Sequence, residues 1–141
     1  MRIVLLKPGD EELLQQAERA FNAPPSPSRC AMLLSDPTFI MVVALTDDGE
    51  VMGRIYGHAL NRYDATDLLL YEVDVDEAHQ RRGAARAMLA HLHDICSRRG
   101  YGEMWVLTDP DNEEGNGLYR SAGGHLENSP TNMYVFPIAK R

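Results

Sequence analysis

A polar turn and the segment that follows it carry the clearest chemical signal in the 141-residue sequence. The turn, Gln80-Arg81-Arg82-Gly83-Ala84-Ala85, directly precedes a segment with helical apolar spacing. Small residues there let a ligand approach the backbone, and the free N–H groups of a first helical turn suit a phosphate or pyrophosphate. The turn lacks the Lys-Ser/Thr of a P-loop and the glycine spacing of a dinucleotide fingerprint. We therefore expect another kind of anion-binding turn, with a charged connection and a chance glycine as the alternative.

Two carboxylates interrupt the apolar run that precedes this turn. Alternation along a strand over residues 68–75 puts Glu72 and Asp74 on one face, opposite Tyr71, Val73 and Val75. A charged residue in an otherwise apolar strand needs a reason, and a base or a substrate contact supplies one. The alternative is an acidic pair on a solvent-facing side.

The rest of the chain supplies the elements that must position these residues. Periodicity and turn signals predict strands at 2–6, 38–46, 50–59, 68–75, 103–108, 125–127 and 132–137. They predict helices at 11–22, 83–98 and 113–122, a loop at 23–28 and a short helical turn at 30–34. This order indicates a single α/β domain over residues 1–141, with a mixed, mainly antiparallel central sheet flanked by helices.

Composition narrows the partners. The net charge of −7, from 21 acidic and 14 basic residues, argues against a nucleic-acid partner. No apolar stretch reaches transmembrane length and the N-terminal run is too short for a signal peptide, so we expect a cytoplasmic protein without a membrane partner. Cys30 and Cys96 make no disulfide framework and no metal-ligand spacing, so we expect reduced thiols and no metal.

Two segments together resemble a known family. Val73-Asp74-Val75, then Gln80-x-x-Gly83-x-Ala85, resembles the acyl-CoA-binding signature of the GCN5-related N-acetyltransferase (GNAT) superfamily, placed five residues after a strand valine. Residues 112–123 resemble the family's helix that opens with an asparagine and carries Leu-Tyr. Tyr71-Glu72 further resembles the Tyr-Asp pair of the small aminoglycoside 3-N-acetyltransferases. The sequence departs from them in having Glu at 72 and Gln at 80, and its first third offers few matches.

The resemblance implies a cofactor site for acetyl-CoA, between strands that are splayed apart. It implies that the backbone of residues 73–75 pairs with the pantetheine arm and polarises the thioester carbonyl, and that the first turn of the helix binds the pyrophosphate. Tyr119 becomes the general acid for the leaving thiolate. The cofactor-binding residues that it implies are Val73, Val75, Gln80, Arg81, Arg82, Gly83, Ala84, Ala85, Arg86, Asn112 and Tyr119.

The acceptor side is inferred from the acidic residues. Glu72 becomes the base or water-orienting carboxylate, and Glu72, Asp74, Asp109 and Asp111 become acceptor contacts. Acids lining a cleft favour a polycationic amine, so we expect transfer to the 3-amino group of an aminoglycoside, hence resistance, with a homodimer suggested by the resemblance. Two alternatives stay open: another amine, such as a polyamine, a protein lysine or N-terminus or a small metabolite, and a non-catalytic acyl-CoA-binding domain.

Overall fold

Ten short elements make up the fold. The computed structural model describes residues 1–127 and 132–138. In chain order the elements are β1 (Arg2–Leu5), α1 (Glu11–Arg19), α2 (Pro27–Ser35), β2 (Phe39–Leu45), β3 (Val51–Asn61), β4 (Thr66–Val75), the 3₁₀ turn η1 (Glu77–His79), α3 (Ala84–Arg98), β5 (Met104–Val106) and α4 (Glu113–Ser121).

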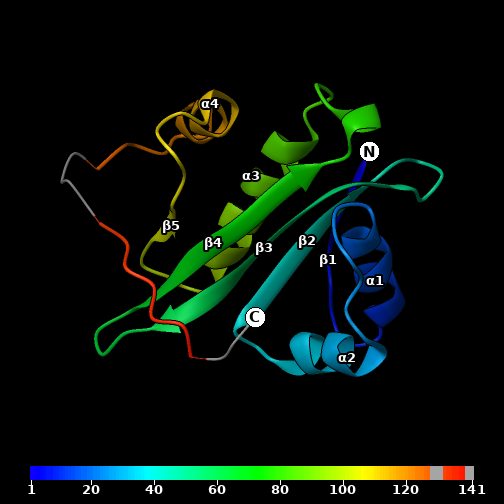
Figure 1. Ribbon diagram of the computed structural model, residues 1–141, viewed down its shortest axis with the longest axis horizontal. Helices are drawn as coiled ribbons and strands as arrows, with labels where there is room; N and C mark the ends of the chain where they lie inside the picture. The colour runs from blue at the N-terminus through cyan, green and yellow to red at the C-terminus, as the bar shows by residue number, and fades with distance from the viewer. Residues whose placement is uncertain (128–131, 139–141) are drawn as a thin grey trace.

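The five strands form one sheet in the order β1-β2-β3-β4-β5. The first four are antiparallel neighbours, and β5 runs parallel to β4. Helices α1 and α2 lie on one face of the sheet, and α3 lies on the other (Figure 1). This arrangement confirms the predicted α/β fold with a mixed, mainly antiparallel sheet.

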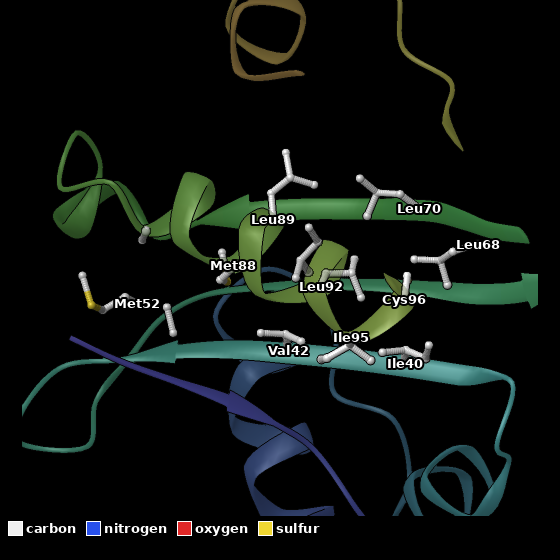
Figure 2. Close-up of a cluster of buried hydrophobic side chains, with 13 residues drawn as sticks. Ile40, Val42, Met52, Leu68, Leu70, Met88, Leu89, Leu92, Ile95 and Cys96 are labelled. Carbon is white, nitrogen blue, oxygen red and sulfur yellow. The ribbon is translucent and has the colours of Figure 1, made fainter. Parts of the chain in front are cut away.

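Strand β2 is buried on both faces and divides the core in two. Ile40, Val42 and Ala44 pack toward α3, whereas the alternate residues Met41 and Val43 pack toward α1 and α2. This is the period-two pattern of a central strand covered on both sides. Figure 2 shows the larger cluster, in which α3 lays one face on the sheet. Its members on α3 are Ala84, Met88, Leu89, Leu92, Ile95 and Cys96.

Helix α2 begins earlier than the sequence pattern suggested. Residues 23–28 were expected to be a loop, but the helix already starts at Pro27. The Ser26 hydroxyl caps it by accepting a 3.1 Å hydrogen bond from the backbone N–H of Arg29. Proline at the first helical position loses no hydrogen bond, so the Ser-Pro pair is itself a helix-start signal.

The C-terminal end of the sheet is smaller than predicted. Strand β5 covers three residues rather than 103–108, and the strands expected at 125–127 and 132–137 are absent from the described residues. Apolar, β-prone side chains at Met133 to Phe136 suggested a strand, yet they are exposed here. A strand needs an edge to pair with, and a three-residue β5 offers little of one.

A β-bulge lies at the middle of the β3–β4 ladder. Tyr56 pairs with Glu72, but the next residue, Gly57, pairs with Leu70, so Tyr71 is the extra residue of β4. A Cβ on Gly57 would overlap the carbonyl oxygen of Leu69, so this close approach of the strands requires glycine. Bulges re-aim side chains and increase strand twist, and this one falls where β5 leaves β4.

The variant Gly57→Ala tests this constraint. The added methyl group must push β3 from β4, so we expect the free energy of unfolding to fall by about 1–3 kcal/mol. Gly117→Ala is the control, because a Cβ there meets open space inside α4 and should stabilise by about 0.5–1 kcal/mol. Urea denaturation measures both, and an unchanged midpoint for Gly57→Ala would contradict the predicted crowding.

Candidate active site

The C-terminal half of β4 has an open edge. The strand pairs with β3 as far as Val75, but with β5 only at Leu68–Leu70. Beyond Leu70, β5 ends at Val106 and the chain turns away toward α4 (Figure 1). In the described part of the chain, no strand covers residues 71–75 on that side. The main-chain groups on that side are therefore open to an extended ligand, except the Val75 carbonyl, which accepts a hydrogen bond from the Gln80 side chain. This is the geometry predicted for the backbone of Val73 and Val75; the ligand contact itself stays a prediction.

The start of α3 lies just past the end of this strand. Gly83 is its N-cap residue with φ +80°, Arg81 has φ +64°, and no side chain caps the helix. A Cβ at Gly83 would meet nothing within 4 Å, so the approach is open. Ala84 is buried and Ala85 half-buried, so the helix starts close to the sheet. The N–H groups of the first turn have no intrahelical acceptor and suit an anion.

Side chains of the turn mostly bind the protein itself. The Gln80 side-chain amide donates to the carbonyl of Val75 at 3.3 Å, and the Arg86 guanidinium donates to the carbonyl of Ser121 at 3.0 Å. Arg82 Nη1 lies 3.5 Å from Nδ1 of the buried His79. The backbone is therefore the more direct anion ligand here, and the predicted contribution of the arginine side chains is not established by these contacts.

Helix α4 is held by two asparagines. Asn112 Oδ1 accepts a hydrogen bond from the backbone N–H of Gly115 at 3.0 Å, and its amide nitrogen donates to Thr108 Oγ1 at 2.9 Å. The Asn116 amide nitrogen donates to the carbonyls of Asp109 and Asn112 at 3.0 and 2.7 Å. The sequence reading missed Asn116, whose only signal is its position one helical turn after Asn112. The predicted contact of Asn112 with pantetheine stays a prediction.

The two acids predicted before α4 are exposed. Asp109 and Asp111 lie in the loop that leads into the helix. Glu113 and Glu114 follow in its first turn, where negative charge complements the helix dipole. Part of the acidic cluster therefore has a structural explanation, and the acceptor contacts of Asp109 and Asp111 stay predictions.

Tyr119 lies half-buried on α4 and packs against the core under α3. Burial raises the pKa of its hydroxyl, and the negative charge of Asp74 raises that pKa further. The hydroxyl therefore stays protonated at neutral pH, which a general acid requires. The charge of Asp74, a predicted acceptor contact, therefore acts on Tyr119, the predicted general acid.

The sequence reading missed the residue at the centre of the site, Arg54 on β3. Its side chain is fully buried and faces three carboxylates. Arg54 Nη2 lies 2.7 Å from Glu72 Oε2, Nη1 lies 2.9 Å from Asp74 Oδ2, and Nε lies 2.7 Å from Glu18 Oε1 on α1. The only signal in the sequence was a lone arginine in an apolar strand. The shared partner confirms that Glu72 and Asp74 occupy one face of β4.

The position of Tyr71 differs from the prediction. Simple alternation puts it opposite Glu72, but its ring centroid lies 5.6 Å from that of Tyr56, whose ring in turn contacts the Arg54 guanidinium. The bulge explains this change, because an extra residue in β4 breaks the period of two. Tyr71 is 62% exposed and lies beside Glu72 on the side that faces the predicted acceptor.

The described residues form no metal-ligand cluster, no membrane-spanning helix and no disulfide. Within residues 1–127 and 132–138, no group of three or more His, Cys, Asp or Glu side chains is arranged to hold a metal ion. None of the helices in this part of the chain is both long and apolar enough to cross a membrane. Cys30 and Cys96 are both free thiols, and burial raises the pKa of each.

These features define an α/β protein whose sheet opens beside an uncapped helix start. The family model described as the acetyltransferase (GNAT) family matches residues 9–123. The chain therefore belongs to the GNAT acetyltransferase family.

Curated relatives match part of the chain. The ribosomal protein bS18-alanine N-acetyltransferases of Escherichia coli and Salmonella typhimurium are 29% and 30% identical over 82 and 81 residues. These matches cover 58% and 57% of this chain, which spans about half the length (55%) of each relative.

Among solved structures, two aminoglycoside acetyltransferases come from uncultured soil metagenomic samples. One of them, meta-AAC0020 in complex with trehalose, has a TM-score of 0.86 at 21% identity, over 96% of this chain and 95% of that one. The other, HMB0005, has a TM-score of 0.78 at 26% identity, over 96% and 98%. The aminoglycoside N-acetyltransferase AAC(6')-Iy, in complex with CoA, has a TM-score of 0.77 at 16% identity, over 96% and 99%.

The environment of Tyr56 predicts a pH effect. Burial, followed by the charge of Glu72, raises the pKa of its hydroxyl to about 12, although Arg54 acts in the opposite direction. Because the hydroxyl has a higher pKa in the folded protein than in the unfolded chain, where it is about 10, its protonated form stabilises the fold below about pH 10. This contribution to the free energy of unfolding is lost as the pH rises to about 12. We expect stability to fall between these values, and Tyr56→Phe to flatten that slope.

Thermal unfolding between pH 9 and 12 and the ultraviolet absorbance of tyrosinate are the measurements. The difference titration, wild type minus Tyr56→Phe, isolates one of the six tyrosines. Tyr63→Phe, at a fully exposed tyrosine, is the matched control. Ionisation of Tyr56 near pH 10 would show that the site is wetter than these contacts indicate.

Proposed function

We propose that this protein is an acetyl-CoA-dependent N-acetyltransferase in which residues 1–141 act as one catalytic domain. Its proposed acceptor is an aminoglycoside, with the 3-amino group favoured, so that acetylation confers antibiotic resistance. One observation carries the proposal: β4 has an edge that no strand covers at residues 71–75, and the same stretch carries the half-exposed carboxylates of Glu72 and Asp74.

The proposed binding of acetyl-CoA rests on main-chain groups that can form hydrogen bonds with it. Pantetheine carries amide groups that can add to an open strand edge, and residues 71–75 offer such an edge. The CoA pyrophosphate needs N–H donors, which the uncapped start of α3 provides around Gly83. A backbone N–H of β4 that points at the thioester oxygen would stabilise the charge that develops on it.

The reaction balances with residues of this chain. The acceptor nitrogen attacks the thioester carbonyl carbon, an N–C bond forms and the C–S bond breaks. Glu72 accepts the proton that leaves the nitrogen, directly or through water, and Tyr119 gives its proton to the departing thiolate. Proton transfer from Glu72 through solvent restores Tyr119, so the products are an amide and CoA with its thiol protonated.

Charge supports a polycationic acceptor. Glu18, Glu72 and Asp74 surround one guanidinium, so this group keeps a formal charge of −2, and the whole chain carries −7. Negative charge at a binding site raises the encounter rate of a polycation and helps to orient it. The solved aminoglycoside acetyltransferases that share this fold also support an aminoglycoside as the acceptor.

A second acceptor class is favoured by the curated relatives. They acetylate the alanine of a ribosomal protein according to their names, and they are 29–30% identical to this chain over 81–82 residues. An N-terminal α-amine carries a single charge, so it makes less use of the acidic group around Arg54. This distinction gives the test.

Thiol release from acetyl-CoA against a panel of amines distinguishes the two candidates. The panel contains gentamicin-like aminoglycosides, linear polyamines and peptides that begin with alanine. We expect turnover with an aminoglycoside, and a kcat/KM that falls as salt rises, because screening weakens charge attraction. Turnover with the peptides alone would replace the aminoglycoside proposal, and no turnover with any amine would overturn the enzymatic one.

The variant Tyr119→Phe tests the acid. It removes the proton donor and keeps the ring that packs on the core, so kcat should fall about a hundredfold or more. The Kd for CoA should change little, and calorimetry measures it separately. Tyr63→Phe serves as the control because Tyr63 is fully exposed. A kcat equal to that of the wild type would remove this role from Tyr119.

A further inference from the structure

The Arg54 guanidinium lies among three carboxylates. Each of its three nitrogens lies within 2.9 Å of a different carboxylate, from Glu18 on α1 and from Glu72 and Asp74 on β4. The ring centroids of Phe21 and Tyr56 lie 5.0 and 5.4 Å from its central carbon. The two Nη contacts are hydrogen bonds to the β4 acids, whereas the Nε–Glu18 contact is a close ion pair without hydrogen-bond geometry, so the planar group is oriented mainly by Glu72 and Asp74.

The exposure of the three acids is unequal. Arg54 itself is 0% exposed and Glu18 is 16% exposed, whereas the side chains of Glu72 and Asp74 are 38% and 47% exposed. Arg54 contacts one oxygen of each β4 carboxylate, Oε2 of Glu72 and Oδ2 of Asp74. Here the guanidinium holds each acid from beneath and leaves part of its surface to the solvent.

We propose that Arg54 is a positioning residue for the acceptor: it holds Glu72 and Asp74 as outward-facing carboxylates that bind a cationic amine. This inference rests on the proposed function, since it assigns the acceptor side of the same site. Without the guanidinium, three carboxylates would share a small volume, and their mutual repulsion would move the two β4 acids from these positions. The acceptor would then lose the geometry of both contacts.

Glu18 extends this effect to α1. The ion pair between Glu18 and Arg54 connects α1 to the β4 carboxylates, because Arg54 also contacts Glu72 and Asp74. Helix α1 therefore influences the acceptor site through Arg54, although Glu18 itself is mostly buried. The acceptor site is defined by two elements far apart in sequence, joined by one side chain.

The variant Arg54→Lys tests the proposal. Lysine keeps the charge but lacks the planar fork, so it cannot hold three carboxylates in this geometry. We expect the KM for the acceptor to rise about tenfold or more, while the KM for acetyl-CoA changes by less than about twofold. Arg98→Lys is the matched control, because Arg98 lies on α3 and forms an exposed pair with Asp94.

Glu18→Gln provides a second route if Arg54→Lys fails to fold. It leaves Arg54 paired with both β4 acids but frees one side of the guanidinium, so the acceptor KM should rise in the same direction by a smaller factor. Steady-state kinetics with both substrates varied and thermal unfolding of the same samples are the measurements.

The possible outcomes separate this inference from the proposed function. An acceptor-specific rise in KM in folded variants supports the positioning role. A lower melting temperature with unchanged KM values would make Arg54 a stabilising residue only and overturn the inference, while the proposed function stands. Wild-type protein that acetylates no amine on the panel would overturn both.

Discussion

A guanidinium with no exposed surface is the constraint around which this structure is arranged. Removing a charge from water is costly, and the ion pairs of Arg54 with three surrounding carboxylates offset that cost. Those carboxylates come from α1 and β4, so the charge of one β3 residue determines how a helix and a strand meet. Breaking such a buried pair by removing one partner typically costs about 3–5 kcal/mol, less where a partner is half-exposed as Glu72 and Asp74 are.

The parting of β4 and β5 is the second determinant of the site. β4 keeps its ladder with β3 while β5 leaves it after three pairs, and the bulge at Tyr71 lies at that point. An unpaired strand edge is normally a liability in a protein. Here it runs from the acidic pair toward the uncapped start of α3, so an extended ligand with an anionic tail can follow it. The same local irregularity turns Tyr71 to the face that carries Arg54.

Much of the fold could be predicted because its signals are local. The apolar period of α3, the strand at 68–75 and the turn at Gly83 are each written in neighbouring residues, and so is the shared face of Glu72 and Asp74. What was missed depends on partners distant in sequence. The ion pairs of Arg54 need the register of β3 against β4, which no pattern within either strand reveals.

The errors have the same origin. A bulge shows only when two strands are aligned, so alternation alone placed Tyr71 on the wrong face. The apolar residues 132–137 have strand propensity, but propensity cannot supply an edge to pair with. The early start of α2 is different, since the Ser26-Pro27 signal was present in the sequence and was read as a loop.

Helix α4 has no fully buried residue: Leu118 and Tyr119 pack against the core only partly buried, and two asparagines and the contact between Arg86 and Ser121 complete its attachment. Its amides therefore belong to the part of the protein that opens by local fluctuation, well below the energy of global unfolding. α3, with six buried residues, belongs to the opposite end of that range. Tyr119 thus lies on the less protected of the two helices, and amide hydrogen exchange on α4 would report when that side chain leaves the core against which it packs.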